Sequence, residues 1–221
     1  IVNAGGTRQL IAWDVSAVYS LNPETGKVYW QQAFPLTQVS NAVTPVQAGS
    51  LLYFSSFYNG SLMLALDEKQ PAARVVWKSK SDSEVVTDSL HNAYSTSIVI
   101  GDYIYGIDSY GQLRCLKLAT GERVWETLAA TTPNGKPARW ATAFLVKHQD
   151  RFFLYNELGD LIIARLSPTG YEEISRAHLL EPTNRAGGRP VHWSHPAFAN
   201  RCVFVRNDRE IICVDLQAGS P

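Results

Sequence analysis

Residues 20–30, Ser-Leu-Asn-Pro-Glu-Thr-Gly-Lys-Val-Tyr-Trp, join an apolar strand end to a polar turn and a second short strand that carries a tryptophan. The pattern returns at residues 115–125 as Cys-Leu-Lys-Leu-Ala-Thr-Gly-Glu-Arg-Val-Trp, and more loosely at residues 65–77. Apolar residues recur with it at intervals of 45–50 residues, at Leu21, Leu66, Leu116, Leu166 and Val214. A fixed period of this length indicates a repeat architecture.

Each period contains short stretches of β-branched and aromatic residues, separated by Gly, Asn and Asp. In the third period these predict strands at residues 95–100, 103–108, 112–117 and 122–126. Four antiparallel strands per repeat of this length predict the blades of an all-β propeller. The chain therefore reads as a single propeller segment of four to five blades, at residues 8–34, 41–78, 94–126, 140–177 and 194–221.

The first and last units are predicted to be incomplete. The first is expected to lack at least its first strand and the fifth its fourth strand, while propellers close with about four to eight blades. Either the two ends complete a five-bladed ring, or the chain is the C-terminal part of a larger propeller, which the abrupt start at Ile1 favours. An open segment would expose sheet edges, so pairing with a second copy of the chain is a further expectation.

The recurring turn resembles the tryptophan-docking repeat of the pyrroloquinoline-quinone (PQQ) propeller family, Ala-x-Asp-x-x-x-Gly-Lys-x-x-Trp. The residues that fill this pattern are Ser20, Asn22, Gly26, Lys27 and Trp30 in the first unit, Cys115, Lys117, Gly121, Glu122 and Trp125 in the third, and Cys213, Asp215 and Gly219 in the fifth. In the fourth unit Ile174 is predicted to stand where the tryptophan belongs, so this blade is expected to dock more weakly. The resemblance implies a bacterial protein that is periplasmic or secreted.

One rim of the propeller is predicted to carry function, namely the rim formed by the connections between blades and the turns between second and third strands. Candidate ligand-binding residues on this rim are His91, Asn92, Arg139, Trp140, His192, Trp193 and His195. An arginine, histidines and tryptophans converging on one mouth suit an anionic or planar ligand. The alternative is that they only satisfy backbone groups and cap the core.

The sequence favours a binding module over an enzyme. The resemblance implies PQQ and Ca²⁺ for the dehydrogenases of the family, which need a vicinal Cys-Cys, but the cysteines here are Cys115, Cys202 and Cys213. We therefore expect a non-catalytic scaffold that binds a protein or small molecule, as the related outer-membrane assembly factors imply. The alternative is a quinoprotein dehydrogenase fragment whose active site is completed by other residues.

Composition restricts the partners. The formal net charge is +0 and the pI is about 7.1, so no basic surface is available for nucleic acid. No apolar run reaches the roughly 20 residues of a membrane-spanning helix.

Two local features give structural expectations. A two-residue turn at Asn207-Asp208 would place Cys202 directly opposite Cys213, as a disulfide in an oxidising compartment or, more readily, as two packed thiols. The glycine-rich residues 184–190 are interpreted as a mobile connection on the ligand rim.

Overall fold

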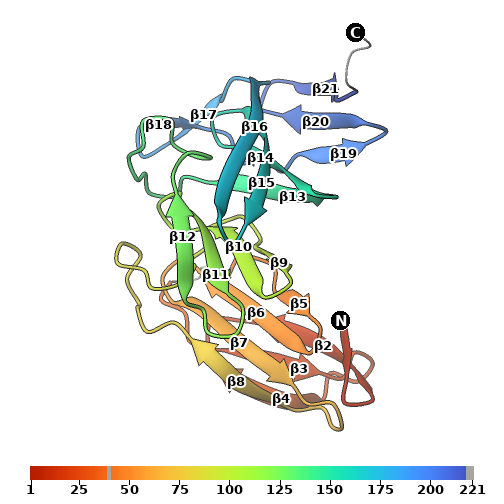
Figure 1. The fold of residues 1–221 in the computed structure, drawn as a ribbon. Helices are drawn as coiled ribbons and strands as arrows, with labels where there is room; N and C mark the ends of the chain where they lie inside the picture. Colours follow the sequence, from red (N-terminus) through yellow and green to blue (C-terminus); the bar gives the residue numbers. More distant parts are fainter. Residues whose placement is uncertain (39–40, 218–221) are drawn as a thin grey trace.

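The chain folds into successive antiparallel sheets that follow one another in sequence order (Figure 1). The computed structural model describes residues 1–38 and 41–217, and every regular element in them is a β-strand. Four sheets have four strands, one has three and one has two. The fold is that of a β-propeller segment, as the repeat predicted. None of the described residues belongs to a helix long and apolar enough to cross a membrane.

The strands of the first two blades are β1 (Val2–Ala4), β2 (Thr7–Trp13), β3 (Ala17–Leu21), β4 (Val28–Ala33), β5 (Val46–Ala48), β6 (Leu51–Ser56), β7 (Gly60–Leu66) and β8 (Ala73–Lys78). Those of the third and fourth blades are β9 (Ile98–Ile100), β10 (Tyr103–Ile107), β11 (Leu113–Lys117), β12 (Arg123–Thr127), β13 (Ala143–His148), β14 (Arg151–Asn156), β15 (Asp160–Ser167) and β16 (Gly170–His178). The fifth blade has β19 (Ala197–Ala199), β20 (Cys202–Arg206) and β21 (Ile211–Asp215), preceded by a hairpin of β17 (Asn184–Ala186) and β18 (Arg189–Val191).

The prediction that the first unit lacks its first strand is wrong. Strand β1 pairs with β2 through Val2 and Gln9, so the first blade has four strands. The strand is only three residues long, and the turn at Gly5-Gly6, both with positive φ, is the signal for it in the sequence. In the fifth blade the described residues contain three strands, and Gly219 lies outside them.

The core lies between the blades. Four clusters of buried apolar side chains each join two consecutive blades, because both faces of an inner blade are covered by its neighbours. Representative pairs are Val18 with Leu62, Met63 with Ile104, Cys115 with Phe152, and Phe144 with Val203.

Two of the repeat tryptophans link their blade to the next one. Trp77 donates its indole N–H to the carbonyl of Leu118 at 2.8 Å, and Trp125 donates to the carbonyl of Ser167 at 2.8 Å. Trp30 instead donates to Gln9 within its own blade at 2.8 Å. A buried indole needs such a partner for its N–H, so the tryptophan both packs and fixes the contact.

In the fourth blade the residue at the tryptophan position is Ser175, and the assignment of Ile174 is wrong. Trp77 and Trp125 each pair with the β-strand residue that precedes a bulge, and in β15 that residue is Ile163, which pairs with Ser175. The bulge follows Ile163, seven residues before Gly170, whereas in the third blade it follows Cys115, six residues before Gly121, so the tryptophan position moves by one residue. The blade thus lacks an aromatic side chain at this position.

The cysteine register also differs from the prediction. Cys213 faces Phe204 and not Cys202, because the β20–β21 turn spans the four residues 207–210. Asn207 stabilises this longer turn through its side-chain oxygen, which accepts two backbone N–H groups at 2.9 Å. Both cysteines are free thiols, and their mutual hydrogen bond raises the pKa of Cys202.

Candidate functional site

Two rims are distinguished by the connections that they carry. The connection rim is the one that holds the turns between second and third strands and the interblade connections, whose described residues are 34–38, 41–45, 79–97, 128–142 and 179–196. The opposite rim holds the turns that join the first strand to the second in all five blades and the third strand to the fourth in the first four.

Arg139 is fixed on the connection rim by a carboxylate and an aromatic ring. Its guanidinium lies 2.6 Å from Glu84 and 4.4 Å from the ring centroid of Trp140. The hydroxyl of Tyr110 donates to the same carboxylate at 3.1 Å. The hydrogen bond to Glu84 raises the pKa of Arg139. The arginine charge is thereby neutralised while 40% of its side chain stays exposed.

A second buried carboxylate organises the neighbouring part of this rim. Glu157, in the β14–β15 turn, is 2% exposed and accepts hydrogen bonds from Arg189 at 3.0 Å and from the indole of Trp193 at 2.9 Å. Burial raises the pKa of Glu157, and the hydrogen bond from Trp193 and the charge of Arg189 oppose this shift. Residues 184–191 therefore form an ordered hairpin held by Arg189, and not the loose connection that their glycines suggested.

Tyr94 packs against Trp193, with the two ring centroids 4.7 Å apart. Burial raises the pKa of the Tyr94 hydroxyl, and the charges of Arg189 and Arg139 oppose this shift. We call Tyr94, Arg139, Trp140 and Trp193 the rim patch. Its members are each partly exposed, with Trp193 at 36%.

The other candidates lie elsewhere. His91 and Asn92 are fully buried; His91 donates its backbone N–H to Asp108 at 2.6 Å, and Asn92 donates its backbone N–H to Ser55 at 3.0 Å. Burial lowers the pKa of His91. These two residues hold the connection between the second and third blades and present no side chain to a ligand on the rim.

The two C-terminal histidines do not converge. His192 is 4% exposed, contacts the hydroxyl of Tyr155 at 3.2 Å, and borders a small cavity of about 140 Å³ beside Trp193. His195 is exposed, with its ring centroid 4.0 Å from that of Phe144. Burial lowers the pKa of both histidines.

One buried ionic network was not predicted from the sequence. Arg114, on β11, contacts Asp108 at 2.8 Å and the carbonyl of Ser89 at 2.6 Å, and both charged side chains are at most 3% exposed. Thr87 donates to the same aspartate at 2.7 Å. An arginine between Leu113 and Cys115 in an apolar strand is the signal, since such a charge requires a buried partner.

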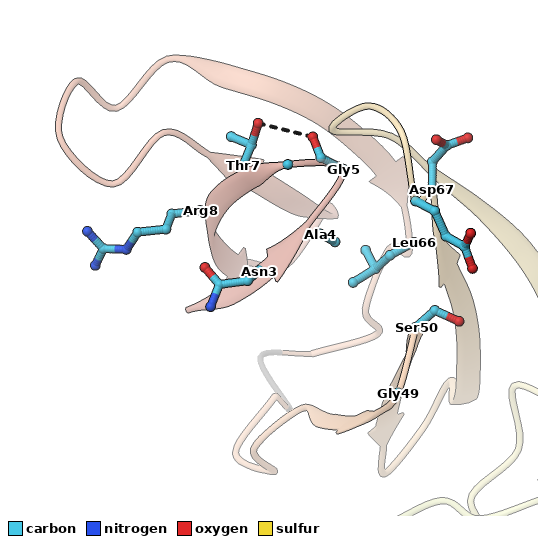
Figure 2. A pocket seen from close by; sticks show the side chains of 11 residues that line it. Asn3, Ala4, Gly5, Thr7, Arg8, Gly49, Ser50, Leu66 and Asp67 are labelled. Carbon is cyan, nitrogen blue, oxygen red and sulfur yellow. Dashed lines mark hydrogen bonds between the residues drawn. The ribbon is translucent and has the colours of Figure 1, made fainter.

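A cavity of about 600 Å³ lies on the opposite rim, between the first and second blades. Figure 2 shows the residues that line it. It is enclosed by the β1–β2 turn, the backbone of Gly49 and Ser50, and the turn that follows Leu66. Arg8 at its edge is an exposed side chain that pairs with Glu24 at 3.0 Å. None of the candidate residues borders this cavity.

The comparisons with known proteins agree with the repeat. A family model described as "Outer membrane protein assembly factor BamB" matches residues 1–155. The chain belongs to this PQQ-like propeller family. No curated protein matches the sequence.

Solved structures of BamB-like shape extend the match to nearly the whole chain. BamB from Moraxella catarrhalis has a TM-score of 0.59 at 16% identity, over 94% of this chain and 55% of that one. The computationally designed Ika8 protein has a TM-score of 0.53 at 11% identity, over 93% of this chain and 57% of the Ika8 chain. The dihydro-heme d1 dehydrogenase NirN, in complex with DHE, has a TM-score of 0.61 at 14% identity, over 99% of this chain and 44% of the NirN chain. The chain thus spans about half the length of the BamB, Ika8 and NirN chains, and identities this low show the fold alone.

Two features that the quinoprotein dehydrogenases need are missing from the residues that the structure describes. Ca²⁺ takes six or more oxygen ligands, but the described part of the BamB-like chain contains no group of three or more His, Cys, Asp or Glu that could hold a metal ion. The three cysteines lie apart in sequence, so the chain has no vicinal pair to contact a quinone.

Proposed function

We propose that the chain is a non-catalytic scaffold whose connection rim docks a partner protein. The observation that carries this proposal is the rim patch, in which Trp193 packs against Tyr94 at a tilt and the guanidinium of Arg139 lies over the ring of Trp140. Tryptophan, tyrosine and arginine are the residues that dominate the binding energy of protein interfaces. Glu84 and Glu157 hold them in place, so little side-chain freedom is lost on binding.

The charge state of the rim patch favours a protein over an anionic small molecule. Arg139 is neutralised by Glu84 and Arg189 by Glu157, so a free anion would have to displace a carboxylate. The family description, an outer membrane protein assembly factor, supports a partner in that machinery and a periplasmic or outer-membrane-associated location. A neutral chain with paired arginines does not suit nucleic acid.

Photo-crosslinking tests the docking surface. We expect an amino acid with a photoreactive side chain at position 193 to form a discrete crosslink to one partner in the cells that make the protein. The matched control is position 27, since Lys27 is exposed on the opposite rim. A product with the mass of two chains would indicate pairing of two copies. Equal crosslinks from the two positions would contradict the proposal.

The rival function is a quinoprotein dehydrogenase fragment, which membership of the PQQ-like propeller family brings into consideration. Because the described residues lack a metal-ligand group, titration with PQQ and Ca²⁺ is expected to give no saturable quenching of tryptophan fluorescence. Saturable quenching together with dye-linked alcohol oxidation would favour the enzyme.

A further inference from the structure

A row of paired residues runs across one face of the second and third blades and ends at a tryptophan. Residues directly opposite each other in an antiparallel sheet place their side chains on the same face. The rows are Val46, Tyr53, Met63 and Trp77 in the second blade, and Ile98, Tyr105, Cys115 and Trp125 in the third. The two middle residues of each row are at most 2% exposed.

In the fourth blade the row ends at a small residue. Its members are Val146, Phe153, Ile163 and Ser175. Phe153 and Ile163 are only partly buried, unlike their counterparts in the second and third blades. The row of the fourth blade therefore offers no indole to the interface with the fifth blade.

A groove of about 690 Å³ lies at this place, between the fourth and fifth blades on the opposite rim. Its apolar wall consists of Val146, Phe153 and Ile163 from the fourth blade with Phe198 and Leu216 from the fifth. The ring centroids of Phe153 and Phe198 lie 5.0 Å apart. An aromatic side chain entering here would meet the kind of surface that Trp77 and Trp125 meet in their own interfaces.

The groove is bordered by more positive than negative charge. Lys147, Arg151 and Arg201 lie along it with a single carboxylate, Asp150. That carboxylate already lies 3.7 Å from Arg165 and 4.0 Å from Arg151. Carboxylates beside an incoming aromatic side chain would therefore be attracted.

We propose that this interblade groove binds an aromatic side chain, tryptophan best, presented by an acidic segment of a partner protein. The partner's aromatic side chain would supply the ring that the fourth blade lacks. The basic residues along the groove would favour acidic residues on either side of that aromatic residue. It lies on the rim opposite the rim patch, so the two surfaces can be occupied together.

The test uses a fluorescent synthetic peptide with one tryptophan between aspartate and glutamate residues. It is expected to bind saturably and more weakly as salt is added, and a peptide with alanine in place of tryptophan is expected not to bind. Ser175→Trp should supply the missing indole, weaken peptide binding by about tenfold or more, and raise Tm by about 2–4 °C. Ser175→Ala should leave the affinity unchanged, and Arg201→Glu should lower it.

Several outcomes would overturn the proposal. They are absence of peptide binding, equal binding of the alanine peptide, and unchanged affinity in a Ser175→Trp protein that melts at or above the wild-type temperature. Indole-3-acetate binding as tightly as the peptide would also overturn it, because the site would then belong to a small molecule.

Discussion

Replacement of Arg114 by alanine is expected to lower the free energy of unfolding by about 3–5 kcal/mol, because it leaves the buried carboxylate of Asp108 without its counter-ion. The guanidinium lies 2.8 Å from Asp108 and also donates to Thr87 and to the carbonyl of Ser89. These contacts anchor the connection that precedes the third blade. Urea unfolding followed by tryptophan fluorescence measures the loss.

A matched variant separates this effect from the general loss of an arginine. Arg74 lies exposed on β8, so Arg74→Ala is expected to change stability by less than about 0.5 kcal/mol. Asp108→Ala combined with Arg114→Ala should cost less than the sum of the single changes, since the pair acts as a unit. An Arg114→Ala protein as stable as the wild type would contradict the buried network.

Trp77→Ala is expected to cost about 3–5 kcal/mol, since it removes a large side chain from the contact between the second and third blades. The indole donates to Leu118 at 2.8 Å and lies against Gly121, where a Cβ atom would come within 2.7 Å of the ring. Trp77→Phe keeps most of the packing and loses the hydrogen bond, so a smaller loss of about 1–2 kcal/mol is expected. Thermal and urea unfolding measure both.

Val75→Ala on the same strand is the control, because this valine is 41% exposed and contributes little packing. Equal losses for Val75→Ala and Trp77→Ala would show that the tryptophan does not join the blades.

The order of the blades was predictable because the apolar residues and turns of each four-stranded unit recur every 45–50 residues. The pairing register of two neighbouring strands depends instead on a single turn or bulge. In the fourth blade the bulge after Ile163 brings Ser175 to the tryptophan position, and the four-residue turn at Asn207 places Cys213 opposite Phe204 and not opposite Cys202. Neither the place of the bulge nor the length of the turn follows from composition, since the sequence at Asn207 suits more than one turn type and bulges depend on local pairing.

The candidate site was predictable in part. Arg139, Trp140 and Trp193 lie on the expected rim because chain direction in an antiparallel blade fixes which connections share an edge. The burial of His91 and the carboxylate partners of the two arginines could not be read from sequence. Glu84 and Glu157 come from segments 55 and 32 residues away from the arginines they contact, and such pairings are set by the packed blades.

The central claim, that the rim patch binds a protein, is tested most directly by titrating the crosslinked partner against wild-type protein and Trp193→Ala by calorimetry. We predict that the variant loses about 2 kcal/mol of binding free energy, or roughly 30-fold in affinity. Lys27→Ala, on the opposite rim, should bind as the wild type does. Unchanged affinity in a folded Trp193→Ala protein would contradict the claim.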